Sequence, residues 1–97
     1  MFARMSTIQG KAESIENGIK EFKELTVPEI KQMAGLKEAV LMVDRKKGKS
    51  LAITFWDTEK DLVSSSAAAA KLRAQADKTA GAAQPPTVET YEVAVKV

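Results

Sequence analysis

Apolar and polar residues alternate near both ends of the chain, over residues 1–8 and 88–97. Alternation with a period of two is typical of a strand with one buried face. Two apolar segments, 39–44 and 50–56, lie near the middle of the chain, and the glycine-containing segment 45–49 separates them. This spacing predicts a β-hairpin, so we expect four strands in all.

Helical periodicity fills the first interval between these strands. Apolar residues recur every three or four positions from Ile15 to Met33, and Gly35 is expected to end the helix. Pro28 lies within this run, so we expect the helix to kink or restart there. Val27, which precedes the proline, should be displaced from helical geometry.

A second helix is expected to begin at Thr58, because a threonine followed three residues later by Asp61 resembles a capping box. Its periodic positions continue to Ala76, and Gly81 should stop it. The order is therefore βαββαβ, which predicts a single ferredoxin-like α+β domain over residues 1–97. In this class the four strands form one antiparallel sheet, and both helices pack on the same face.

The hairpin is apolar on both faces of its second strand. The two sets of side chains are Leu51, Ile53 and Phe55 on one side, and Ala52, Thr54 and Trp56 on the other. One set can pack on the helices, but the chain has no further element to cover the other set. A second copy of the same sheet would cover it, so we expect a homodimer with apposed sheets, in which either set could face the partner.

Composition argues against several classes of protein. The chain has 15 basic and 13 acidic residues, a balance that does not favour nucleic acid or an anionic membrane as a partner. Leucine and isoleucine also stand where RNA recognition motifs stack bases on aromatic rings. With no cysteine and no histidine, we expect no disulfide, no metal site and no cofactor. No stretch has the length of a membrane span or the apolar core of a secretory signal, so we expect a cytoplasmic protein.

Three residues are candidates for ligand binding: Arg4, Trp56 and Tyr91. Arg4 lies within a strand that should be central in the sheet, so we expect it to pair with an acid on the last strand, Glu92 first and Glu89 second. An anion-binding role is the alternative. Trp56, at the end of its strand, could plug the core or stack on a ligand.

Five segments carry a resemblance to a known superfamily: residues 2–5, 27–36, 41–44, 53–59 and 91–95. They resemble the dimeric α+β barrel superfamily, in particular the small proteins grouped with the antibiotic biosynthesis monooxygenases. The resemblance implies a homodimer whose two sheets face each other. Some relatives oxidise polyketide aromatics without metal or flavin, some degrade haem, and many have no assigned reaction.

The haem-degrading branch is expected to be excluded, because its asparagine, tryptophan and histidine fall on Ala3, Ser65 and Gln75. The cofactor-free oxygenases place an asparagine, a tryptophan and an arginine around an acidic phenol. This chain offers Trp56 and Arg4 for two of these roles.

We therefore expect a homodimer of unassigned activity that binds a small apolar or aromatic molecule between helices and sheet. One alternative is a cofactor-independent monooxygenase acting on an aromatic polyketide-like substrate. The other is a structural or regulatory dimer with a filled core. A cavity of roughly 300 Å³ or more would favour a ligand.

Overall fold

The computed structural model describes residues 1–97, and its elements follow the expected βαββαβ order. They are β1 (Phe2–Gln9), η1 (Ala12–Ser14), α1 (Ile15–Glu21), η2 (Phe22–Thr26), α2 (Val27–Lys31), β2 (Leu36–Asp44), β3 (Lys49–Trp56), α3 (Glu59–Ser64), α4 (Ser66–Thr79) and β4 (Thr87–Glu92). None of the helices has the length and apolar character needed to cross a bilayer.

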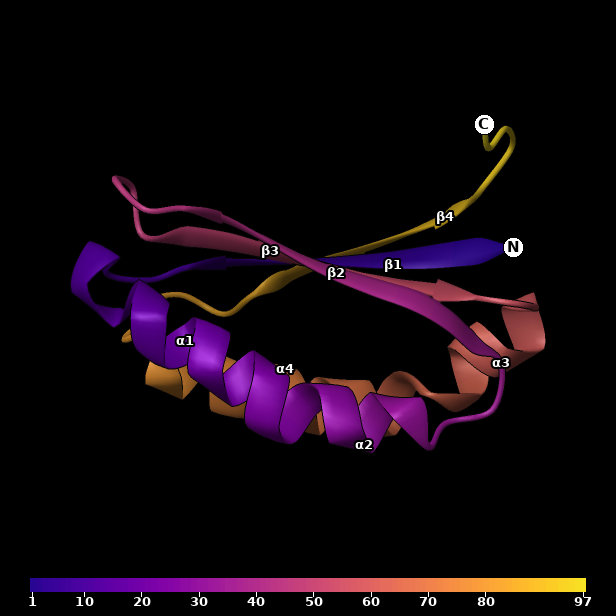
Figure 1. The fold of residues 1–97 in the computed structure, drawn as a ribbon, viewed down its shortest axis with the longest axis horizontal. Helices are drawn as coiled ribbons and strands as arrows, with labels where there is room; N and C mark the ends of the chain where they lie inside the picture. Colours follow the sequence, from indigo (N-terminus) through magenta and orange to yellow (C-terminus); the bar gives the residue numbers. More distant parts are fainter.

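The four strands form one antiparallel sheet in the order β2-β3-β1-β4, so β1 and β3 are central. All helices lie on one face of this sheet (Figure 1). The predicted α+β ferredoxin-like fold is therefore confirmed. In the register of the sheet, Arg4 of β1 lies opposite Thr54 of β3 and Thr90 of β4.

The first helical region changes its winding ahead of Pro28. Between α1 and α2, the segment η2 is a π-helical turn in which the Phe22 carbonyl accepts a hydrogen bond from the Val27 N–H. This wider turn makes room for the proline ring, which would otherwise clash with a carbonyl of the preceding turn. The expected irregularity is therefore present. The expectation for Val27 is wrong, because its φ of −59° and ψ of −47° are helical.

The second helical region begins as predicted and then breaks. Thr58 caps α3, because its Oγ1 accepts a hydrogen bond from the Asp61 N–H at 3.1 Å. The helix is interrupted at Ser65, whose hydroxyl donates to the Leu62 carbonyl at 2.7 Å. Gly81, with φ at +66°, follows the end of α4 as expected.

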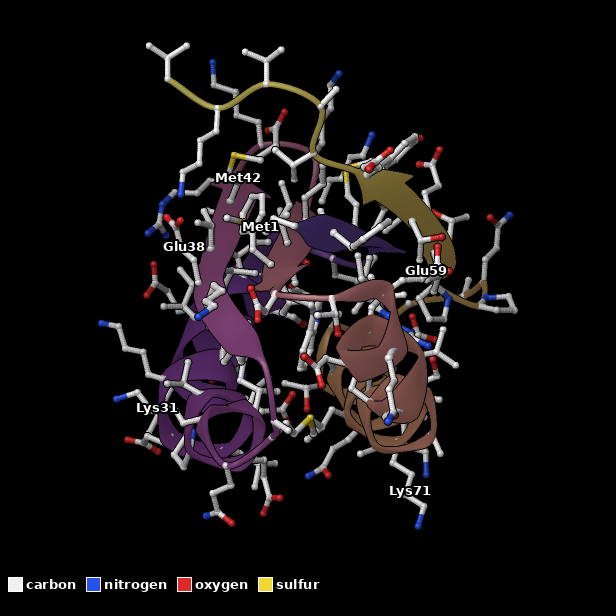
Figure 2. All side chains as sticks on the ribbon, turned by 90° about the vertical axis from the view of Figure 1, so that its right-hand side faces the viewer. Met1, Lys31, Glu38, Met42, Glu59 and Lys71 are labelled. Atoms are coloured by element: carbon white, nitrogen blue, oxygen red, sulfur yellow. The ribbon has the colours of Figure 1, made fainter.

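The last strand is shorter than predicted. β4 ends at Glu92, and the N–H of the next residue, Val93, donates to the carbonyl of Met1 at 2.9 Å. Because β1 begins at Phe2, the sheet offers no partner beyond this point. Residues 94–97 therefore leave the sheet, and they lie on the same side of it as Met42 (Figure 2).

The sheet has one face against the helices and one that they leave bare (Figure 1). Ala52, Thr54 and Trp56 line the space under the helices, so Leu51, Ile53 and Phe55 face the other way. Met5 of β1 and Val40 of β2 lie opposite Ile53 and continue this apolar surface, which we call the open face. Only 10 of the 97 residues of the chain are buried, which is a small core for a domain of this size.

Candidate functional site

A cavity of about 100 Å³ lies between the helices and the sheet and is partly open to solvent. Its walls come from β1, β2 and β3 on one side and from α1, η2, α2 and α4 on the other. Small residues at facing positions leave the space unfilled: Ser6, Gly18, Ala52, Ala69 and Ala76. Around them the lining is mostly apolar, with Ile8, Ile19 and Leu72 among its members.

The volume of this cavity limits what it can hold. It is smaller than the roughly 300 Å³ expected of a ligand pocket, so the size of the cavity by itself does not favour a ligand over a filled core. It is nearer in scale to an engineered apolar cavity of about 150 Å³ that takes up benzene. As it stands, the cavity therefore fits a single ring at most, and a larger molecule would have to extend through the open side or separate the helices.

Arg4 is buried in the wall of this cavity, with 4% of its surface exposed. Its Nη1 donates to Ser65 Oγ at 3.0 Å, and its Nη2 donates to the Leu62 carbonyl at 2.7 Å and to Ser66 Oγ at 3.1 Å. All three acceptors are neutral oxygens at the junction of α3 and α4. The guanidinium thus joins β1 to the break in the second helical region.

The predicted ion pair between Arg4 and Glu92 or Glu89 is wrong. Thr90 lies opposite Arg4, whereas Glu92 lies opposite Phe2 and Glu89 opposite Met5. The guanidinium turns to the α3–α4 junction because the hydroxyls and carbonyl there supply short hydrogen bonds. No carboxylate lies within 4.0 Å of it.

The structure brings Trp56 and Arg4 together. Trp56 lines the same cavity, is 1% exposed, and donates from Nε1 to Thr54 Oγ1 at 2.9 Å. The Cζ atom of Arg4 lies 5.8 Å from the centre of the indole ring, within cation–π distance. Trp56 therefore closes the core and also forms part of the cavity wall.

Tyr91 lies elsewhere. It is opposite Ala3, on the face of the sheet turned away from the helices, and is 53% exposed. Its hydroxyl donates to a carboxylate oxygen of Glu89 at 2.6 Å. This hydrogen bond and the charge of Glu89 raise the pKa of Tyr91. Tyr91 does not line the cavity.

Charge in the cavity is unbalanced. Burial, and to a smaller extent the charge of Arg73, lowers the pKa of Arg4. Burial also lowers the pKa of Arg73, which reaches the same cavity from α4. Neither arginine forms an ion pair.

Three of these residues were missed from the sequence: Ser65, Ser66 and Arg73. The run of three serines at 64–66 was a signal, because serine competes with the helix for backbone hydrogen bonds. Arg73 lies one turn after Ala69, on the stripe of α4 that faces the sheet, where a charged residue is unusual.

The positions assigned to the haem-degrading pattern do not meet in one site. Ala3 lies next in sequence to Arg4 and points to the opposite face of the sheet, Ser65 bonds to Arg4, and Gln75 is exposed on α4. Asn17, the one asparagine of the chain, is exposed on α1. No group of three metal-ligating side chains comes together in the structure.

Comparison with known sequences gives distant relatives. No family model matches the chain. The chain is 30% identical over 94 residues to the uncharacterized protein Rv2557 of Mycobacterium tuberculosis, and 28% identical over 96 residues to the uncharacterized protein Rv2558 of that organism. It spans only about two fifths of the length of these relatives, 41% and 39%.

Comparison with solved structures is more informative about the fold. The chain resembles a monooxygenase of Streptomyces coelicolor in complex with nanaomycin D, with a TM-score of 0.80, 13% identity, and coverage of 99% of this chain and 89% of that one. It resembles an antibiotic biosynthesis monooxygenase with a TM-score of 0.69, 20% identity, and coverage of 98% and 100%. The haem degrader MhuD of Mycobacterium tuberculosis, with two haems in its active site, gives a TM-score of 0.72, 15% identity, and coverage of 100% and 99%.

These likenesses show the fold. The chain shares its α+β fold with solved antibiotic biosynthesis monooxygenases. At 20% identity or less, the similarity establishes the fold, and the activity has to be argued from the site.

Proposed function

We propose that this protein is a homodimer that binds a small apolar or aromatic molecule in the cavity between its helices and its sheet. Arg4 and Trp56 form the polar end of this site. The observation that carries the proposal is the burial of the Arg4 guanidinium, beside an indole ring and against a cavity, without a carboxylate partner.

A buried charge without a counter-ion is costly, by several kcal/mol for each ion. Ionisable groups with perturbed pKa values are concentrated in functional clefts. A ligand that interacts with the guanidinium would offset the cost. Two similar structures have a ligand bound, nanaomycin D in one and haem in the other, which supports a ligand-binding role for this fold.

The homodimer is supported by the exposed surface of the chain. A folded monomer of 10.5 kDa should expose about 5,400 Å². This chain exposes 6305 Å², about 900 Å² more than a folded monomer of that mass. The excess is close to the roughly 800 Å² that each partner buries in an interface of standard size. The apolar open face, with Ile53 at its centre, is where a second sheet would pack.

The ligand site can be tested with the intrinsic fluorescence of Trp56, the only tryptophan in the chain. The first probes are phenol, benzamide and benzoate. We expect saturable changes in emission for at least one of these compounds, because a ring in the cavity would lie close to the indole.

Two alanine substitutions make a matched pair for this test. Ala69 lines the cavity, whereas Ala70, the next residue of α4, is exposed. Ala69→Leu should fill the space and weaken binding, and Ala70→Leu should bind as the wild type does. Equal binding by wild type and Ala69→Leu, or no binding by any compound of the panel, would overturn the proposed site.

A second candidate function is a cofactor-independent monooxygenase. The closeness of Arg4 and Trp56 favours it, because the oxygenases of this superfamily place an arginine and a tryptophan around an acidic phenol. The cavity has no asparagine, which departs from that pattern. Oxygen uptake with a panel of anthrone-like phenols tests this function. Turnover by wild type that is lost in Arg4→Met would support it, and no turnover by either protein would leave a binding protein.

A further inference from the structure

A second arginine lines the cavity. Arg73 of α4 lines the cavity together with Arg4, although the two residues come from different layers of the fold. Arg73 takes part in none of the side-chain hydrogen bonds and ion pairs of the chain. The positive charge of Arg73 also contributes, after burial, to the lowered pKa of Arg4.

No acidic residue forms an ion pair with either arginine. The charged residues that line the cavity are Arg4, Lys11, Arg73 and Glu21, so cations outnumber anions by three to one. The carboxylate of Glu21 accepts a hydrogen bond from Thr79 Oγ1 at 2.6 Å and is not paired with either arginine. Asp77, one turn after Arg73, does not line the cavity and forms no ion pair.

Hydrogen-bond donors are left over as well. A guanidinium has five N–H groups. In Arg4, three of them are used by Ser65, Leu62 and Ser66, which leaves the Nε–H and one Nη1–H without a protein partner. None of the five N–H groups of Arg73 has a hydrogen-bond partner in the protein. Arg4 is therefore anchored to the α3–α4 junction through Nη1 and Nη2, and two of its N–H donors have no protein partner.

We propose that the ligand of this cavity is a single-ring organic acid whose carboxylate is held by Arg4 and Arg73, with its ring in the apolar part of the cavity. This inference rests on the proposed function and specifies its ligand. A carboxylate fits because its two oxygens accept paired hydrogen bonds from guanidinium groups. A single ring is the upper limit, because the cavity has a volume of only about 100 Å³.

A purely structural role for Arg73 makes a different prediction. An arginine can cover apolar surface with its methylene stem while its head stays in water. Replacing such a residue lowers stability whether or not a ligand is present. Replacing a cation that binds the ligand relieves repulsion in the empty protein and weakens only the binding of anions.

Benzoate and benzamide separate these roles, because they have nearly the same shape and differ in charge. Their affinities are measured by Trp56 fluorescence for wild type, Arg73→Gln and Lys71→Gln. The last variant is the control, since Lys71 is an exposed base on the same helix and outside the cavity. We expect wild type and Lys71→Gln to prefer benzoate by about tenfold or more, and Arg73→Gln to lose most of this preference while still binding benzamide.

Thermal unfolding without ligand is the second measurement. Arg73→Gln should unfold at the same temperature as wild type or higher, because one of two repelling charges is gone. A lower unfolding temperature, or an unchanged preference for benzoate in Arg73→Gln, would overturn the role of Arg73. Equal affinities of wild type for benzoate and benzamide would overturn the proposal that the ligand is an organic acid, but not the proposed ligand site. Binding of neither compound would contradict both proposals.

Discussion

Replacing Ile53 by lysine should dissociate and unfold this protein. Ile53 is at the centre of the open face, opposite Met5 and Val40. In a dimer with apposed sheets, Ile53→Lys places two ammonium groups in an apolar interface. Its sequence neighbours Ala52 and Thr54 face the helices, so lysine there would test the cavity and not the interface.

The size of the effect follows from the surface available. An interface of standard size buries about 800 Å² of each partner. An unpaired charge buried in it costs several kcal/mol, and the lost packing of a buried isoleucine adds about 2 kcal/mol or more. Even a total of about 4 kcal/mol per dimer raises the dissociation constant about 1,000-fold.

A released monomer should not remain folded. With only 10 of 97 residues buried, its core is too small to hold the open face in water. Folding and assembly are then coupled, and the unfolding temperature rises with protein concentration. Sedimentation equilibrium at micromolar concentration, together with circular dichroism during heating, measures both properties.

Ala70→Lys is the control, because it adds the same charge at an exposed position of α4. It should sediment and unfold like wild type. Wild type sedimenting as a folded 10.5 kDa monomer at micromolar concentration would refute the reasoning. So would Ile53→Lys with the mass and unfolding temperature of wild type.

Three further predictions concern single side chains. Arg4→Met should change the free energy of unfolding by no more than about 1 kcal/mol in urea, because three lost hydrogen bonds are offset by the removal of a desolvated charge. A loss above about 3 kcal/mol would show that the guanidinium is compensated within the protein. Thr58→Ala should destabilise the protein by about 1 kcal/mol through loss of the α3 cap, and an unchanged denaturation midpoint would contradict that role. Ultraviolet titration should find the pKa of Tyr91 above its usual value, because its hydrogen bond to Glu89 stabilises the protonated form. Glu89→Gln should move the titration to lower pH, and no movement would show that the pair does not form in solution.

The fold could be predicted because the residue patterns that specify its strands and helices are local in sequence. The alternation of strands, the period of the helices and the cap at Thr58 all act within a few residues of sequence. Pro28 predicted an irregularity in the first helical region. It did not predict that this irregularity is a π-helical turn in which Val27 keeps helical backbone angles. The end of β4 depended on where β1 begins, which is a property of the assembled sheet.

The candidate site could be predicted only in part. Arg4 and Trp56 were recognised as unusual, but their meeting depends on the register between β1 and β3. A shift by one residue would have turned Arg4 to the open face. The partners of Arg4 come from the break at Ser65, and Arg73 reaches the cavity only because α4 packs on the sheet. Neither contact could be predicted from the residues near it in the sequence.

The most direct test of the central claim, a ligand site between helices and sheet, is proton–nitrogen correlation NMR of the wild-type protein during separate titrations with benzoate and benzamide. We predict saturable shifts of the Trp56 indole N–H and of the Arg4 Nε–H, together with the backbone amides of Ala69 and Leu72. The amide of Tyr91 should stay in place. Shifts confined to the open face around Tyr91, or no saturable shift with either compound, would contradict the account.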